Sequence, residues 1–215
     1  MQNACDKLDM NRKKKSFYAQ EQEREDVKIK RSDFIDSVES IDPSKLIFID
    51  ESGAHLGMSS DYARAEGGQR AVMPKPFNKG EKFSIIGAIA LTGIVAMLYT
   101  ASAVNTTIFK EFLEQLLVPK LKRGQFVILD NVSFHKSQEI IDLIESTGAK
   151  VVFLPPYSPD LSPIEKMWSK IKEIFKRKKP RNKADFHDAI FTAITSMNSN
   201  DFDEWYEACG YSLVK

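Results

Sequence analysis

Three acidic side chains stand where a carboxylate is costly unless it has a function. Asp50 follows the apolar run Leu46–Ile49, Asp130 follows the apolar run Phe126–Leu129, and Glu165 lies at the start of a predicted helix. A carboxylate at the end of a buried strand must be paired or bind a metal ion to offset its loss of water. Converging carboxylates repel one another and lose their charge unless cations lie among them.

The chemistry open to such a cluster is metal-assisted phosphoryl transfer. Carboxylate oxygens suit Mg²⁺ or Mn²⁺ rather than zinc, and the sequence holds no Cys/His cluster. Two such ions, about 3.5–4 Å apart, activate a water or a 3′-hydroxyl and stabilise the leaving oxygen. The sequence therefore predicts a site for two Mg²⁺ (or Mn²⁺) ions, with Asp50, Asp130 and Glu165 as the catalytic and metal-binding residues.

Glu165 has a second, purely structural interpretation. Ser162-Pro163-Ile164-Glu165 has the form of a capping box, in which the glutamate bonds back to the residue that caps the helix. Short motifs of this kind are often coincidental. Both interpretations stay open on the local sequence, and the two distant acids favour the metal-binding one.

A basic run follows Glu165. Between Lys166 and Lys183 there are nine Lys or Arg residues against one acid, Glu173. Such a run is typical of a surface that binds a polyanion such as the DNA backbone, although it is also typical of a merely solvated helix face. The predicted phosphate contacts are Lys166, Lys170, Lys172, Lys176, Arg177, Lys178 and Lys179.

The elements that position these acids alternate between strands and helices. Apolar runs predict strands at 46–49, 83–91, 94–100, 126–129 and 151–154, with a further short strand at 62–65. Helical periodicity predicts helices after the caps Asn105 and Asn182, at 137–146, from 164 onward and near 202–209. If the first strand lies beside 126–129, Asp50 and Asp130 project from the same sheet edge.

The whole-chain composition sets the protein class. The chain has 215 residues, 42% of them hydrophobic, with 31 basic and 30 acidic side chains. Its two cysteines, Cys5 and Cys209, suggest no disulfide framework, and no apolar run reaches the roughly 20 residues of a membrane span. These features predict a soluble cytoplasmic protein, associated with the nucleoid if it binds DNA, with no membrane partner.

Three motifs together resemble one family. FIDESG around Asp50, LDNVSFH around Asp130 and LPPYSPDLSPIEKMW around Glu165 resemble the catalytic domain of mariner-like DDE superfamily transposases of bacterial insertion sequences. The 34 residues between Asp130 and Glu165 are typical of that group. The resemblance covers about residues 45–178, and its proline-rich third motif is the most specific part.

The resemblance implies a fold, an activity and partners. The expected fold is α/β: a ribonuclease-H-like mixed sheet, with three antiparallel and then parallel strands, flanked by helices. The catalytic domain spans 45–179, and residues 180–215 form C-terminal helices packed on it. The implied activity is phosphodiester hydrolysis and strand transfer at transposon ends, on double-stranded DNA, in a homodimer.

Four residues near the motifs carry open alternatives. Asn131 and His135 match the second motif: each is a candidate DNA contact, but Asn131 can instead orient Asp130 and His135 can be a loop or packing residue. Glu51 faces away from Asp50 on a strand and is expected to be structural. Trp168 is expected in the core rather than stacked on a base.

The resemblance also departs from the family at the N-terminus. Family members usually begin with a helix-turn-helix region that reads transposon ends, whereas residues 1–44 here predict a helical arm or linker. The sequence thus predicts a missing DNA-reading domain, supplied by an upstream-frame helix-turn-helix protein. It also leaves open a truncated, non-catalytic regulator that binds DNA or a full-length transposase, and a ribonuclease that acts on hybrids.

Overall fold

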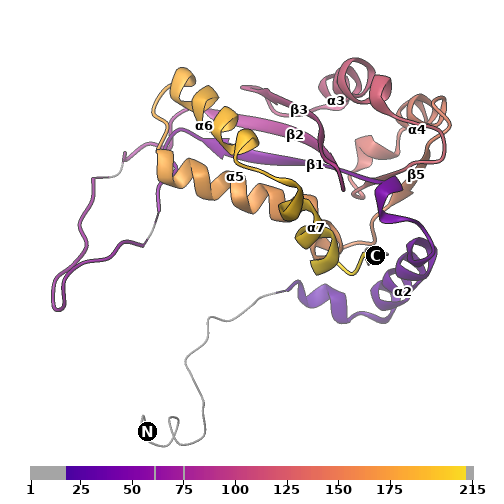
Figure 1. Cartoon of the computed structure of the whole chain (residues 1–215), viewed down its shortest axis with the longest axis horizontal. Helices are drawn as coiled ribbons and strands as arrows, with labels where there is room; N and C mark the ends of the chain where they lie inside the picture. The colour runs from indigo at the N-terminus through magenta and orange to yellow at the C-terminus, as the bar shows by residue number, and fades with distance from the viewer. Residues whose placement is uncertain (1–17, 61, 75, 212–215) are drawn as a thin grey trace, which may run out of the picture.

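The centre of the molecule is a five-stranded mixed sheet in the order β3-β2-β1-β4-β5. A computed structural model describes residues 18–60, 62–74 and 76–211. Strands β1 (Leu46–His55), β2 (Lys82–Ala90) and β3 (Gly93–Thr100) are antiparallel neighbours. Strands β4 (Phe126–Leu129) and β5 (Lys150–Phe153) run parallel to β1. The predicted mixed sheet and the predicted neighbourhood of β1 and β4 are therefore confirmed (Figure 1).

One face of the sheet is covered by the helices that lie between β3 and β5 in the chain. Helix α3 (Thr106–Phe112) continues into a π-helical turn, Leu113–Leu117, and α4 (Gln138–Glu145) lies beside them. The Asn105 side chain accepts a hydrogen bond from the Ile108 N–H, as its predicted capping role requires. These elements bury apolar side chains against Ile47, Ile49, Val127 and Leu129 of the sheet.

The opposite face is covered by the C-terminal helices and by the arm. Helix α5 (Ile164–Lys178) lies along the sheet, with α6 (Lys183–Thr195) and α7 (Ser199–Ala208) packed against it. The arm helix α2 (Glu25–Glu39) follows a short 3₁₀ turn, Gln20–Glu23, and buries Val27, Phe34 and Val38. Of these, Phe34 and Val38 belong to this second core, and Figure 1 shows α2 near α7.

Two predicted elements differ in the structure. β1 does not end at Ile49 but continues to His55, because β2 pairs with it along that whole length. Residues 62–65 are not a strand: they belong to the long connection between β1 and β2, and the Tyr62 side chain is 85% exposed. A segment that buries so little apolar surface has no sheet to join.

The predicted arm begins with a basic cluster at residues 12–15. That cluster and Cys5 lie outside the described residues. No helix within the described ranges is both long enough and apolar enough to cross a bilayer.

Candidate active site

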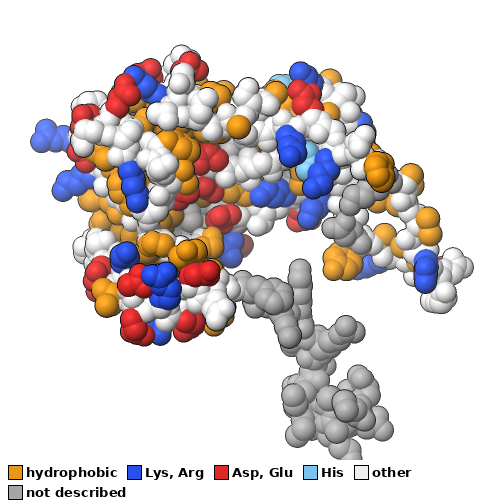
Figure 2. All heavy atoms as spheres, turned by 180° about the vertical axis from the view of Figure 1, so that it is seen from behind, with side chains coloured by type: hydrophobic (Ala, Val, Ile, Leu, Met, Phe, Trp, Pro, Cys, Tyr) orange, Lys and Arg blue, Asp and Glu red, His pale blue; other side chains and the backbone are white. Residues whose placement is uncertain are grey.

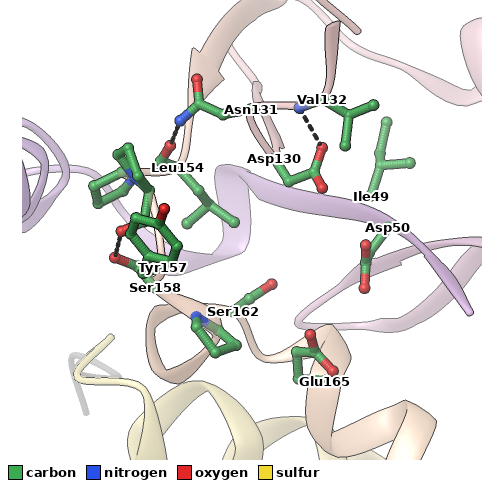
Figure 3. Close-up of a pocket in the computed structure, with 13 residues that line it drawn as sticks. Ile49, Asp50, Asp130, Asn131, Val132, Leu154, Tyr157, Ser158, Ser162 and Glu165 are labelled. Atoms are coloured by element: carbon green, nitrogen blue, oxygen red, sulfur yellow. Dashed lines mark hydrogen bonds between the residues drawn. The ribbon is translucent and has the colours of Figure 1, made fainter. Parts of the chain in front are cut away.

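The three predicted acids line one pocket of about 380 Å³ at the end of the parallel strands (Figure 3). Asp50 comes from the middle of β1, Asp130 directly follows β4, and Glu165 lies in the first turn of α5. Figure 3 shows the carboxylates of Asp50 and Glu165 facing each other, with Asp130 on the far side of Asp50. The rest of the wall is the proline-rich loop at 155–163.

Strand register explains why Asp50 and Asp130 share this pocket. Phe48 pairs with Ile128, and the same offset places Asp50 level with Asp130. Both paired residues belong to the core beneath α5. Side chains two residues apart on a strand point to the same face, so Asp50 points toward α5 as well. The topology thus brings two acids that lie 80 residues apart in the sequence to one margin of the sheet.

Trp168 holds Asp50 in place. Its indole Nε1 donates a hydrogen bond to Asp50 Oδ2 at 2.9 Å, and its ring is 2% exposed. The ring fits because Gly87, the partner of Asp50 on β2, has no side chain: a Cβ there would lie 2.8 Å from Trp168 Cη2. Trp168 is a core residue, as predicted, but no local pattern indicates its bond to Asp50, which lies 118 residues away.

The surroundings of Asp50 do not stabilise its ionised form. Burial is the largest cause that raises its pKa, the negative charge of Glu165 comes next, and together they raise it from 3.8 to about 7. The bonds from Trp168 and the backbone oppose this shift only in part. A buried carboxyl facing a second carboxylate is the arrangement that a divalent cation neutralises.

The Glu165 side chain does not form the capping box that the local sequence allows. The N-cap of α5 is Pro163, and no side chain caps the helix there. The contact between the two ends of the motif is a backbone bond, from the Glu165 N–H to the Ser162 carbonyl at 3.2 Å. The predicted capping box is therefore absent, and within the described residues no group donates a hydrogen bond to the Glu165 carboxylate.

Asp130 has the opposite environment, because a buried histidine holds it. His135 Nδ1 lies 2.6 Å from Asp130 Oδ1, and His135 Nε2 lies 3.0 Å from Glu51 Oε1. Burial by itself lowers the pKa of His135, but the bonds and charges of Asp130 and Glu51 outweigh it and raise it to about 9. Burial is also the largest single influence on Asp130 and raises its pKa, but the bonds from His135 and the Val132 N–H, together with the nearby positive charges, outweigh it and lower that pKa below 3.8.

These contacts correct one sequence prediction and refine two others. His135 is fully buried and both ring nitrogens face carboxylates, which contradicts its predicted contact with DNA. Glu51 lies on the other side of β1 from Asp50 and meets the site only through His135. The Asn131 amide donates to the Leu154 carbonyl and so joins the ends of β4 and β5 beside the pocket.

The donor set is of the kind that hard divalent cations favour. Three carboxylates surround the pocket, and all of them offer oxygen. No group of three or more acidic, histidine or cysteine side chains in the described ranges is close enough to hold one ion together. Figure 3 shows Asp50 between the other two acids.

The basic run on α5 divides into paired and unpaired cations. Lys170 Nζ contacts both carboxylate oxygens of Asp201 at 2.6–2.7 Å, so its charge is already bound, unlike the free phosphate contact predicted for it. Lys172 and Lys176 lie on the same helical face as Glu165. In the described part of the chain no acid pairs with Lys166, Lys172, Lys176, Lys178 or Lys179. Figure 2 shows mixed charges over the arm, whereas basic side chains gather where the β1–β2 connection leaves the body.

Comparison with known proteins agrees with this geometry. Residues 45–187 match the family described as DDE superfamily endonuclease. No curated protein matches the sequence. Similar solved structures include a Mos1 transposase paired-end complex with the left transposon end, with TM-score 0.78, 14% identity and coverage of 97% of this chain and 68% of that one.

Two further Mos1 structures extend the comparison. The Mos1 mariner paired-end complex with Mn has a TM-score of 0.79 at 14% identity, covering 98% of this chain and 67% of that one. The isolated catalytic domain of Mos1 mariner transposase has a TM-score of 0.64 at 13% identity, covering 92% and 97%. At these identities the likeness concerns the fold: the sheet and its helices are ribonuclease-H-like, as predicted.

Proposed function

The chain belongs to the DDE superfamily endonucleases and has the fold of a transposase catalytic domain, and from this premise we propose that it cuts and joins DNA at transposon ends with two divalent cations. The observation that carries the proposal is the pocket itself. Three acids from three separate elements line it, and the pKa of Asp50 is raised because it is buried and faces Glu165.

Each acid has a distinct part in the proposed reaction. Two bound Mg²⁺ or Mn²⁺ ions would activate the attacking oxygen and stabilise the leaving one. Asp50, central and fixed by Trp168, would contribute to both positions. Asp130, fixed by His135, and Glu165, without a competing partner, would each complete one position. Water would add to the phosphorus as its bond to the 3′-oxygen breaks. The freed 3′-hydroxyl would then bond to the phosphorus of a target phosphodiester as that phosphorus loses its own 3′-oxygen, which leaves as a hydroxyl.

The proposed DNA path runs from the pocket along α5. Lys172 and Lys176 continue the face that begins with Glu165, and Lys166, Arg177, Lys178 and Lys179 lie beside it. Mos1 transposase is solved in complex with a transposon end, which supports DNA as the partner here. Asn131 lines the pocket and stays a candidate contact. We place the catalytic unit at 45–179, with 180–215 covering it and 1–44 as the linker.

The wider setting belongs to the same proposal. The sequence resemblance supports a bacterial insertion sequence, a homodimer in the active complex, and a helix-turn-helix partner from an upstream frame. Association with the nucleoid would follow from a DNA substrate. Mos1 complexes are solved with Mn and with Mg, which supports either ion as the cofactor.

The test is Mn²⁺-dependent nicking of supercoiled DNA by purified protein. Asp50→Asn, Asp130→Asn and Glu165→Gln should each lower the nicking rate by about 10²–10⁴-fold, since metal catalysis supplies several kcal/mol. Glu173→Gln is the matched control, because Glu173 is an exposed acid on the same helix that faces Arg177. Three variants that nick like the parent would refute the proposal.

Two other outcomes separate the alternative functions. Protein that shifts DNA in a salt-sensitive manner but never nicks it would be the non-catalytic regulator. Protein that cuts the RNA strand of a hybrid and leaves duplex DNA intact would be a ribonuclease.

A further inference from the structure

The arm helix α2 forms hydrogen bonds to the loop that precedes Glu165. The Arg31 guanidinium on α2 donates to Asp160 Oδ2 at 2.6 Å, to Asp160 Oδ1 at 3.0 Å and to Ser158 Oγ at 2.7 Å. The Arg31 side chain is only 19% exposed. A two-pronged guanidinium–carboxylate contact is geometrically specific, unlike most surface ion pairs.

The loop 155–163, to which Arg31 bonds, contains one strained backbone conformation. Tyr157 adopts a φ of 57°, in the left-handed region that side chains other than glycine rarely occupy. Such a conformation costs about 1–3 kcal/mol and persists only where neighbouring contacts enforce it. Those contacts come largely from the arm: Gln22 donates to the Tyr157 carbonyl, and Arg31 binds Ser158, which in turn donates to the Pro156 carbonyl at 3.0 Å.

The same loop is a wall of the candidate active site. Tyr157, Ser158 and Ser162 line the pocket together with Asp50 and Asp130, and the chain passes from Ser162 directly into the turn of α5 that carries Glu165. Displacing the loop therefore displaces Glu165 relative to Asp50. Arg31 itself does not line the pocket and lies outside the residues 45–187 that match the family.

We propose that Arg31 is a positioning residue, through which the arm sets the conformation of the loop 155–163 and hence the place of Glu165 opposite Asp50. The inference rests on the proposed function of the pocket. It makes the arm part of the catalytic unit rather than a linker alone. A displacement of the arm would then change the position of Glu165, one of the proposed metal ligands.

The variants are Arg31→Ala, Arg31→Lys and the exchange Arg31→Asp with Asp160→Arg, all in the full chain. Arg24→Ala is the matched control, because Arg24 is the N-cap of the same helix and, among the described residues, its side chain bonds only to its near neighbour Asp26. Arg31→Ala should lower Mn²⁺-dependent nicking at least tenfold and raise the half-saturating Mn²⁺ concentration several-fold. Arg31→Lys should fall between, because one ammonium cannot make both bonds.

A readout that does not depend on nicking is the rise in melting temperature that Mn²⁺ causes. At fixed Mn²⁺, Arg31→Ala should show a smaller rise than the parent, and Arg24→Ala an equal one. The exchange variant should regain most of what Asp160→Arg alone loses. The inference would be overturned if Arg31→Ala nicked DNA and responded to Mn²⁺ like the parent. It would also be overturned if the exchange variant were no better than Asp160→Arg alone. The proposed function is tested separately, by Asp50→Asn.

Discussion

Removing the central acid should stabilise the metal-free protein while it destroys the site. Asp50 is buried and faces Glu165, so its ionised form is unfavourable in the folded state. Asp50→Asn keeps the shape of the side chain and an oxygen that can accept the Trp168 bond, but it has no charge to bury. We therefore expect this variant to be more stable than the parent in EDTA at neutral and higher pH.

The size of the gain follows from linkage between protonation and folding. The pKa of Asp50 is about 7 in the folded protein against 3.8 for the ordinary group. Each unit of that difference is worth about 1.36 kcal/mol, so ionised Asp50 costs the folded state about 4 kcal/mol. Because the folded pKa is raised, the folded state holds more protons between these two values. The cost is therefore absent below pH 4, grows as the pH rises to 7 and is complete above it.

The assay is urea unfolding of both proteins in EDTA between pH 4.5 and 8.5. The difference in unfolding free energy should be small at the lowest pH and rise to about 4 kcal/mol at the highest. Glu173→Gln is the control, because Glu173 is an exposed acid on α5. Mn²⁺ should then narrow the difference: it stabilises the parent by about 2.7 kcal/mol at 100 times its dissociation constant and by about 4.1 kcal/mol at 1,000 times, and it stabilises the variant far less. A difference that does not change with pH would refute the environment described for Asp50.

Three further changes test other parts of the site. Gly87→Ala pushes a methyl group against the Trp168 ring, so it should cost about 1–3 kcal/mol in thermal unfolding and also lower nicking, since Trp168 fixes Asp50. His135→Asn should remove about 3 kcal/mol of stability. Because the pKa of His135 in the folded protein is raised to about 9, this stability is complete in the parent below pH 6.5 and is lost as the pH rises through 9. Urea unfolding at pH 6 and pH 10 measures the difference. Lys176→Ala should reduce the slope of log DNA affinity against log salt by about 0.9, and Lys170→Ala should leave it unchanged because Asp201 already binds that ammonium.

The features that could be predicted from sequence are those set by local patterns. Apolar runs located all five strands, and short polar residues before a periodic segment located the caps Asn105 and Asn182. The extra length of β1 was missed because its second half carries few apolar residues. What extends it is pairing with β2, which lies about 30 residues further along the chain.

The contacts that tune the site were beyond any local pattern. The partners of His135 lie 5 and 84 residues away, so the sequence could not show that both of its nitrogens are bound inside the protein. The bond from Trp168 to Asp50 and the grip of Arg31 on Ser158 each join residues more than 100 positions apart. The capping-box motif, by contrast, is a local pattern that the structure does not form, because the Glu165 side chain lies in the pocket and does not cap α5.

Asp50 and Asp130 each follow by two residues the paired residues Phe48 and Ile128 of neighbouring parallel strands, yet their environments push their pKa values in opposite directions. Asp130 has a cationic partner inside the protein, since His135 sits between it and Glu51. Within the described residues Asp50 has only neutral donors, the Trp168 indole and the Glu51 backbone N–H, and it faces the charge of Glu165. A fold that needed all three acids only for packing would gain by neutralising the Asp50–Glu165 pair as it neutralises Asp130. Leaving that pair without a protein cation is costly for folding, and the cost makes sense if a cation from solution is meant to bind there.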